Sequence, residues 1–362
     1  MDTPTRERIL SIRDLDISFA TSSGMLHALR GIKLDLFRGE TVAIVGESGS
    51  GKSVTAKAIM GILSSNGRIN SGSIVYRHVA ADGGAREYDI VRMSQKEVRS
   101  EICGKRIAMV FQDPMTSLNP TMTIGRQIME AMRYHYGRSR SEARTRAEEL
   151  LALVGIDNPG RRMRQYPNEL SGGMRQRVVI AIALSCDPDI LICDEPTTAL
   201  DVTVQARILE LIKDIQEKTR VTVIYITHNL GVVAKVADYV AVMYAGRIIE
   251  KGAIEEVFYD PRHPYTWGLL SSLPDTAGTA ERLYSIPGNP INLLNEFPGD
   301  AFAPRNQLAL NIDYRLPPPM FNVGGKHRVA SWLAHERSPK VGLPVELRAR
   351  IQSMLSENAL DA

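Results

Sequence analysis

Short stretches of the chain are apolar from end to end, and helical patterns separate them. Thr41–Val45 and residues 190–193 and 221–226 carry almost only apolar side chains over the length of a strand. Such runs are typical of strands that are buried on both faces of a parallel sheet. Helices are expected between them, at about 52–63 and at about 202–218. Strands that alternate with helices in this way predict a three-layer α/β core.

Other patterns flank this core. Apolar and polar positions alternate between residues 9 and 36, as in short antiparallel strands. Residues 64–90 are rich in Ser, Gly and Asp, which predicts loops with one strand at 73–76. From about 94 to 170 the spacing of apolar residues is helical, most clearly at 141–154. The fold class expected is therefore an α/β core with an antiparallel β subdomain and a helical subdomain at about 94–170.

A proline-rich segment follows the core. Residues 261–345 hold many prolines and show little periodicity, and the chain has no internal repeat. The domain organisation expected is one core domain at 1–260 and a C-terminal extension at 261–362. A disordered tail is the alternative, but such tails rarely keep aromatic residues. We expect the larger apolar side chains of the extension to form a small core against the preceding domain or against a partner chain; they are Tyr265, Trp267, Leu269, Leu270, Leu283, Phe297, Phe302, Tyr314, Phe321 and Trp332.

Composition and charge argue against several classes of function. The formal net charge of +3 over 362 residues gives no general case for nucleic-acid binding. Cys103, Cys186 and Cys193 lack the C-x-x-C spacing of a local zinc site. Cys186 and Cys193 lie in or beside apolar runs, and we expect them to be buried free thiols. The longest strictly apolar stretch, about seven residues at 178–184, is far below the roughly 18 residues of a membrane-spanning helix. A protein of this kind that works at a membrane is expected to dock on one.

A glycine-rich loop follows the first buried strand. It has the pattern G-x-x-x-x-G-K-[ST] and comprises Gly46, Glu47, Ser48, Gly49, Ser50, Gly51, Lys52 and Ser53. Its glycines allow a tight turn whose backbone N–H groups converge on phosphate oxygens, and the following helix adds its positive N-terminal end. In such a loop the Lys52 ammonium reaches the β- and γ-phosphates and the Ser53 hydroxyl ligates Mg²⁺. We interpret the run as a nucleotide-binding P-loop, and not as a turn that binds nothing.

Two adjacent acids follow the apolar run at 190–193. Asp194 is placed to hold Mg²⁺, directly or through water, as the strand-end acid of other P-loop enzymes does. Glu195 is placed to polarise the attacking water. By itself the pair is better explained as a solvated strand end. Together with the P-loop it favours a site that hydrolyses a nucleoside triphosphate.

A second glycine motif precedes these acids by about twenty residues. It comprises Leu170, Ser171, Gly172, Gly173, Met174, Arg175, Gln176 and Arg177. Alone, Ser171 before two glycines is an ordinary helix N-cap. At this distance from Asp194, however, the run resembles the signature of the ATP-binding cassette ATPases, and the resemblance covers roughly residues 8–258. Ser171 and the amides of Gly172 and Gly173 would then open a helix and form a second anion-binding terminus.

The resemblance assigns roles to four more residues. Gln112 resembles the glutamine that senses the γ-phosphate and Mg²⁺ at the join to the helical subdomain. His228 resembles the histidine that contacts the γ-phosphate, and Asp201, in the run 198–201, belongs to a loop that crosses to the partner ATPase. Phe19 falls where the family places an aromatic ring on adenine, with core packing as the alternative.

The resemblance also implies how such a protein works. Two cassettes meet head to tail and enclose two ATP molecules between the P-loop of one chain and residues 171–173 of the other, so hydrolysis requires a dimer. Closure excludes water and aligns the nucleophile. Gln112 and residues 117–137 would pass the closure to a transmembrane partner. The family works with ATP and Mg²⁺, as a peripheral subunit at the cytoplasmic face of the cell membrane.

Further runs of residues narrow the resemblance to one branch of the family. Residues 111–120, 263–270 and 302–305 resemble the oligopeptide/dipeptide importer ATPases, and residues 54–56 resemble the first of their two ATPase paralogues. The partners implied are the paralogous ATPase subunit, two transmembrane permease subunits and an extracytoplasmic solute-binding protein. An importer for nickel or another small solute is the alternative. A soluble cassette protein of DNA repair or translation is disfavoured, because the sequence has no coiled-coil insertion and no tandem cassette.

One departure from the family concerns iron. Many relatives have several cysteines in the extension, the first directly after the Pro-Arg step, and these can hold an iron–sulfur cluster. This chain has Asn306 at that position and no cysteine after Cys193. A cluster normally needs about four thiolate ligands, so we expect no iron–sulfur cluster and a role of the extension in assembly. A chain truncated near Asp260 is then expected to bind ATP but to associate less well with its partner subunit.

Overall fold

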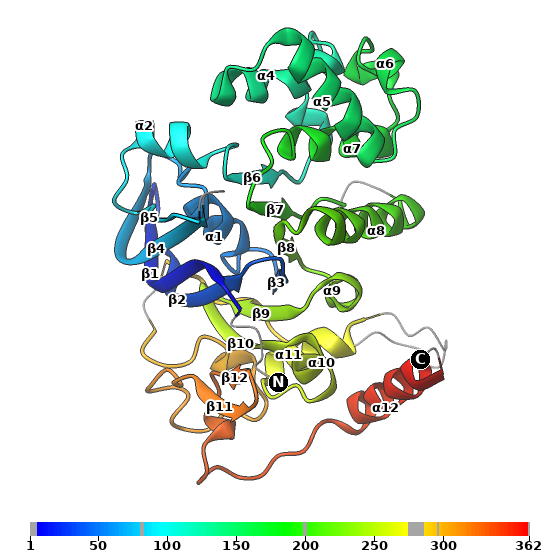
Figure 1. Ribbon diagram of the computed structural model, residues 1–362. Helices are drawn as coiled ribbons and strands as arrows, with labels where there is room; N and C mark the ends of the chain where they lie inside the picture. Colours follow the sequence, from blue (N-terminus) through cyan, green and yellow to red (C-terminus); the bar gives the residue numbers. More distant parts are fainter. Residues whose placement is uncertain (1–5, 80–82, 198–200, 274–285, 295–296, 361–362) are drawn as a thin grey trace.

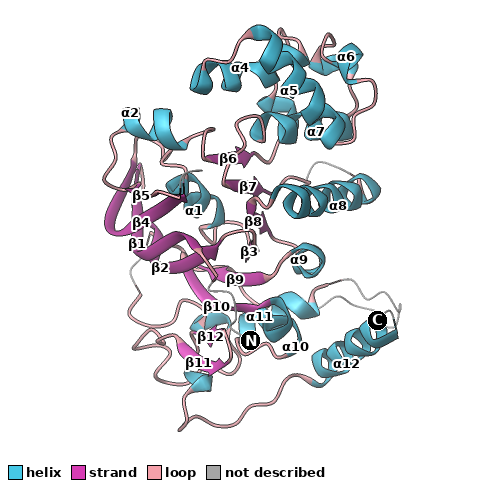
Figure 2. Cartoon of the chain, in the orientation of Figure 1, coloured by secondary structure: helices cyan, strands magenta, loops and turns pink. Residues whose placement is uncertain are grey.

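Two β-sheets occupy the middle of the molecule, between a helical region and the C-terminal extension (Figure 1). The computed structural model describes residues 6–79, 83–197, 201–273, 286–294 and 297–360. Helices flank the larger sheet, whereas much of the extension is loop (Figure 2). Within the described ranges, none of the helices has the length and apolar character that crossing a bilayer requires.

The larger sheet contains the buried strands expected from the sequence. Its eight members are β3 (Thr41–Val45), β6 (Ile107–Val110), β7 (Ile190–Asp194), β8 (Thr222–Thr227), β9 (Tyr239–Tyr244), β10 (Arg247–Ala253), β11 (Phe321–Gly324) and β12 (His327–Val329). They lie in the order β11-β12-β10-β9-β3-β8-β7-β6, and the run from β9 to β6 is parallel. Every residue of β3, β6, β7 and β8 is buried, so the predicted α/β core is confirmed. Because parallel strands end at the same edge, the segments that follow these four strands meet there.

The smaller sheet is antiparallel and packs against the larger one. Its strands are β1 (Arg8–Thr21), β2 (Gly24–Phe37), β4 (Gly67–Val79) and β5 (Ala85–Asp89), in the order β2-β1-β4-β5. Side chains of β1 and β2 share one apolar cluster with Ile44 of β3 and Ile192 of β7. The expectation of mostly loops at 64–90 is wrong, because β4 pairs along β1 from Gly67 to Tyr76. Its polar first half faces solvent while the ladder holds its backbone, so pairing overrides the weak local preference.

Helices cover the parallel strands and form the helical subdomain. Helices α1 (Lys52–Ile59), α8 (Val202–Thr219) and α9 (Leu230–Val236) follow β3, β7 and β8. The subdomain contains α3 (Pro114–Ser117), α4 (Ile124–Tyr136), α5 (Arg140–Leu153), α6 (Pro159–Arg162) and α7 (Gly172–Ala183), and α2 (Gln95–Glu97) precedes it. The predicted helical stretch at 94–170 is interrupted by β6, which pairs with β7 in the central sheet. The pattern of four consecutive apolar residues is the same in a strand and in a helix, which explains why the sequence does not predict β6.

The C-terminal extension packs on the core and adds to its sheet. It contains α11 (Pro264–Ser271), β11, β12 and α12 (Val345–Leu360), and α10 (Ile254–Tyr259) leads into it. Strand β12 pairs with β10, an addition to the central sheet that the sequence does not reveal. Tyr265 and Phe302 share an apolar cluster with Val45 of β3, which confirms part of the expected core against the preceding domain. The expectation is wrong for Tyr314, which is 53% exposed, and for Phe321 and Trp332, which pack against each other outside this cluster. Leu283, also expected there, lies outside the described residues.

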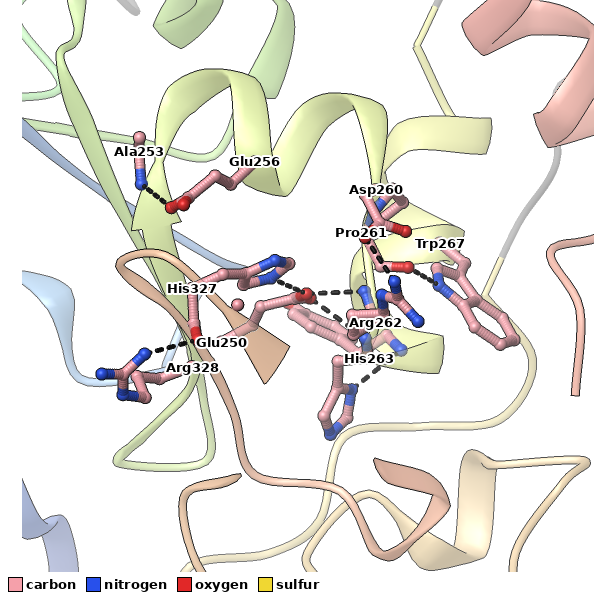
Figure 3. Close-up of polar contacts among 12 residues, drawn as sticks. Glu250, Ala253, Glu256, Asp260, Pro261, Arg262, His263, Trp267, His327 and Arg328 are labelled. Atoms are coloured by element: carbon pink, nitrogen blue, oxygen red, sulfur yellow. Dashed lines mark hydrogen bonds and ion pairs between the residues drawn. The ribbon is translucent and has the colours of Figure 1, made fainter. Parts of the chain in front are cut away.

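A buried carboxylate joins the core to the extension (Figure 3). Glu250 of β10 is fully buried. Its oxygens accept hydrogen bonds from the backbone N–H groups of Arg262 (2.6 Å) and His263 (3.1 Å), and Nε2 of His327 lies 2.8 Å from Oε1. One side chain of the core therefore fixes both the start of α11 and strand β12.

Replacing Glu250 with alanine is expected to lower the free energy of unfolding by about 2–4 kcal/mol, because each buried polar group left without a partner costs about 1–3 kcal/mol. Urea denaturation of the full chain, followed by circular dichroism, measures this loss. Glu217 is exposed on α8, and Glu217→Ala should change the free energy by less than about 0.5 kcal/mol. An equal effect of the two substitutions would contradict the anchoring role of Glu250.

Candidate functional site

Four predicted segments gather at the edge where the parallel strands end. The glycine-rich loop at 46–53 connects β3 to α1, and Gln112 lies just after β6. Asp194 ends β7 with Glu195 directly after it, and His228 follows β8. Strand order places β7 and β3 on either side of β8, with β6 beyond β7. Sheet topology therefore accounts for the meeting of residues that are far apart in the sequence.

The glycine-rich loop needs its glycines for close packing. At Gly46 an added Cβ would lie 2.2 Å from the carbonyl oxygen of Met243 in β9. Gly51 has a φ of 102° and lies so near β2 that a Cβ would meet Leu29 Cδ2 at 2.7 Å. Ser48 and Gly49 are exposed at the tip of the loop, whereas Ser50 is buried. Larger residues at the two tight positions would displace the loop from the strands that support it.

Lys52 occupies the inside of the loop. Its side chain is buried, and Nζ donates hydrogen bonds to the carbonyl oxygens of Gly46 (2.8 Å) and Glu47 (2.9 Å). Burial lowers the pKa of Lys52, although the nearby Glu195 and Asp194 carboxylates oppose this shift. A buried ammonium that is held by neutral carbonyls gains from an anionic partner, since low dielectric strengthens the attraction. Phosphate oxygens are suitable partners.

Ser53 and Asp194 bring a hydroxyl and a carboxylate oxygen close together. The Ser53 hydroxyl donates to Oδ1 of Asp194 over 3.1 Å. Asp194 is buried, and this burial raises the pKa of its carboxyl against the lowering effect of the Ser53 hydrogen bond. Hydroxyl and carboxylate oxygens are ligands that Mg²⁺ prefers, and the cation would offset the cost of the buried negative charge. The donor set therefore fits the predicted metal.

Glu195 is the point where three loops converge. Gln112 Nε2 donates to Glu195 Oε2 over 3.3 Å, and His228 Nδ1 lies 3.3 Å from Oε1. Glu195 has a φ of 46°, in the left-handed region that costs a residue other than glycine about 1–3 kcal/mol. Gln112 and His228 are both exposed, so solvent reaches this side of the cluster. The arrangement brings a carboxylate, an amide and an imidazole to one place beside the glycine-rich loop.

The second glycine motif lies at the N-terminal end of α7. Ser171 caps α7, where its hydroxyl accepts from the N–H of Met174 over 3.4 Å. Gly172 is exposed, and an added Cβ at Gly173 would lie 2.9 Å from Val204 Cγ1 in α8. In the part of the chain that the structure describes, no hydrogen bond or ion pair joins residues 171–173 to the loop at 46–53.

The remaining predicted residues have local roles that the structure describes. Asp201 caps α8, because its Oδ1 accepts from the N–H of Val204 over 2.9 Å. Residues 198–200, expected to cross to a partner, lie outside the described residues. Phe19 is partly buried beside the cluster of the two sheets, and an added Cβ at Gly67 would meet its ring at 2.7 Å. Adenine stacking by Phe19 stays a prediction, with packing as its alternative.

Two contacts at the glycine-rich loop are not indicated by the sequence. The backbone N–H of Glu47 donates to Tyr265 Oη over 2.8 Å, and the Glu47 carboxylate pairs with Arg305. From the sequence, Tyr265 is an apolar residue of the extension and Arg305 belongs to a family-like run, and neither pattern indicates a contact with Glu47. Arg305 is 258 positions from Glu47, so no local pattern signals their contact.

Known proteins share both the fold and the sequence. A family model described as "ABC transporter" matches residues 29–198, and one described as "Oligopeptide/dipeptide transporter, C-terminal region" matches residues 249–312. The oligopeptide transport ATP-binding protein OppD of Bacillus subtilis (strain 168) is 53% identical over 96% of this chain and 95% of its own. The dipeptide transport ATP-binding protein DppD of the same organism is 50% identical over 92% of this chain and 96% of its own. Among solved structures, the dimer of the ATP-binding cassette MJ0796 bound to ADP and Pi matches with a TM-score of 0.57 at 26% identity, covering 68% of this chain and 99% of that one.

Proposed function

The chain belongs to the ABC transporter family and carries the C-terminal region of its oligopeptide/dipeptide transporters, and from this premise we propose that it powers the uptake of oligopeptides or dipeptides. As a member of the family it hydrolyses ATP and couples hydrolysis to transport through permease partners. The relatives reported above are named for peptide transport. Their names favour peptides over nickel or another small solute.

The loop at 46–53 is proposed to hold the phosphates of ATP. Lys52 would exchange its carbonyl partners for β- and γ-phosphate oxygens, as the lysine of a P-loop does. Ser53, Asp194 and Gln112 are the residues proposed to hold Mg²⁺, which neutralises phosphate charge when bound. The 3.1 Å contact between Ser53 and Asp194 supports this assignment, since it gathers two hard oxygen ligands beside Lys52.

Glu195 is proposed as the general base, and its convergence with Gln112 and His228 is the observation that carries the proposal. Its carboxylate would accept a proton from the attacking water as the water oxygen approaches the γ-phosphorus. His228 would contact the γ-phosphate and hold the carboxylate in place from the other side. Such positioning and charge stabilisation supply most of phosphoryl-transfer catalysis.

A second ATPase chain is proposed to complete the site. Residues 171–173 make no hydrogen bond or ion pair with the chain's own P-loop among the described residues, which supports a role on the nucleotide of a partner. The cassette MJ0796, which is similar in fold, is described as a dimer. We infer a heterodimer with a paralogous ATPase, two permease subunits and an extracytoplasmic solute-binding protein, with this chain at the cytoplasmic face of the membrane.

The substrate is tested with the importer assembled in proteoliposomes. ATP hydrolysis is expected to rise at least severalfold when a peptide-loaded binding protein is added, because closure around ATP must follow substrate delivery. Release of phosphate measures the effect, and accumulation of labelled peptide in the vesicles measures transport. The same vesicles with nickel in place of peptide are the control. Stimulation by nickel and none by peptides would overturn the peptide assignment.

A further inference from the structure

Every polar group of Glu47, the second residue of the P-loop, has a partner. Its carboxylate accepts two hydrogen bonds from Arg305, from Nη1 (2.7 Å) and Nη2 (3.1 Å). Its N–H donates to Tyr265 Oη (2.8 Å), and its carbonyl oxygen accepts from Lys52 Nζ (2.9 Å) and from the N–H of Ser50 (3.2 Å). One residue thus links two side chains of the C-terminal extension to the lysine proposed to bind phosphate.

Arg305 is itself rigidly held. Its side chain is only 4% exposed, and Nε donates to the carbonyl oxygen of Pro287 over 2.9 Å. The guanidinium carbon lies 5.7 Å from the centre of the Tyr244 ring. Burial alone would lower the pKa of Arg305, but its hydrogen bonds to Glu47 and Tyr244 outweigh this and raise it. A bidentate pair whose arginine is buried loses little conformational freedom and differs from a fully exposed ion pair, which contributes at most about 1 kcal/mol.

Tyr265 reaches the loop from α11. It is fully buried, and its ring centre lies 4.8 Å from that of Tyr244 and 5.4 Å from that of Phe302. The same cluster contains Val45, the residue immediately before the P-loop. The extension therefore supports both the last residue of β3 and the first turn of the loop.

We propose that Arg305 and Tyr265 are positioning residues for ATP, which fix Glu47 and through its backbone hold the P-loop and Lys52 ready for the phosphates. Neither is a catalytic residue, since both act through Glu47. A loop that is held before the nucleotide arrives costs less ordering entropy on binding. This inference rests on the proposed assignment of residues 46–53 as the P-loop. It also reverses an expectation from the sequence, because a chain truncated near Asp260 would lose both residues and bind ATP weakly.

Arg305→Gln in the full chain tests the proposal. We expect the dissociation constant for ATP, measured by displacement of a fluorescent ATP analogue, to rise about tenfold, or about 1.4 kcal/mol. In the assembled importer KM for ATP should rise by a similar factor, with kcat changed less than about twofold, because the transition-state contacts of a formed complex remain. Arg305→Lys should recover only part of the affinity, since an ammonium cannot form the bidentate pair.

Glu47→Gln gives a second route to the same contact. It keeps the loop backbone and weakens the pair from the other side, so it replaces Arg305→Gln should that variant fail to fold. In the double variant Glu47→Gln/Arg305→Gln the dissociation constant for ATP should be no higher than in the single variant that binds ATP more weakly, because the two changes remove the same interaction. A dissociation constant raised by the product of the two single effects would contradict the proposal.

Arg38→Gln is the matched control. Arg38 is partly buried and likewise pairs with carboxylates, of Asp189 (3.0 Å) and Glu7 (3.2 Å). Among the described residues no hydrogen bond or ion pair joins it to the P-loop. The substitution is expected to lower the thermal midpoint of unfolding and to change the dissociation constant for ATP by less than about twofold.

An Arg305→Gln chain that binds ATP as tightly as the unchanged protein would overturn the inference. Should Lys52→Ala also bind ATP normally, the P-loop assignment itself would fail, which separates the two conclusions.

Discussion

Glu195→Gln in the assembled importer is expected to bind ATP and to hydrolyse it at least about a hundredfold more slowly, since a general base contributes about 10²–10⁴-fold. The amide keeps the size of the side chain and its contacts with Gln112 and His228, but it cannot accept the proton of the attacking water. Phosphate release at saturating ATP measures the rate. Glu217→Gln, on the exposed face of α8, should hydrolyse ATP normally.

The slowed variant should also accumulate the closed state. With its paralogue, Glu195→Gln is expected to elute as a stable dimer from a sizing column in ATP and as separate chains without it. Adding Ser171→Arg to the same chain should abolish this dimer, because residue 171 is proposed to meet the nucleotide of the partner. Turnover of Glu195→Gln at the normal rate would mean that another group activates the water.

Lys52→Ala is expected to weaken ATP binding at least about tenfold and to reduce hydrolysis below about 1% of the normal rate, because a charge-assisted contact to the transferred phosphate is lost. The substitution also leaves the carbonyl oxygens of Gly46 and Glu47 without the ammonium that now joins them. Displacement of a fluorescent ATP analogue and phosphate release measure the two effects. Lys57→Ala, exposed on the same helix, should change neither by more than about twofold. Normal hydrolysis by the Lys52 variant would remove this lysine from the mechanism.

Local patterns were sufficient to predict the parts of the site that lie next to a buried strand. Lys52 is predicted by an apolar run and the P-loop motif, and Asp194 and Glu195 are predicted by a second apolar run taken together with that motif. The parallel sheet then brings the three residues to one edge. Gln112 and His228 could be assigned to the site only from the family resemblance, since each follows a different strand and neither carries a motif of its own.

Long-range pairing was the part that no local pattern revealed. Strand β4 is polar in its first half and is held by its ladder with β1, while β6 is too short to show a period. The link from Arg305 to Glu47 spans 258 positions, and that from His327 to Glu250 spans 77. In each link a charged residue, Arg305 or Glu250, is buried and its partner comes from a distant segment. Such pairs form only when the chain folds, so no local pattern predicts them.

The pairing of β12 with β10 has a consequence for biosynthesis. Chains emerge from the ribosome from the N-terminus onward, and domains generally begin to fold in that order. Strand β10 therefore leaves the ribosome well before β12, and until then its outer edge and the Glu250 carboxylate have no strand beside them. An unpaired edge strand is a template for pairing with other chains. Synthesis interrupted between these strands would thus leave a nascent cassette prone to aggregation, and completion of the extension closes that edge.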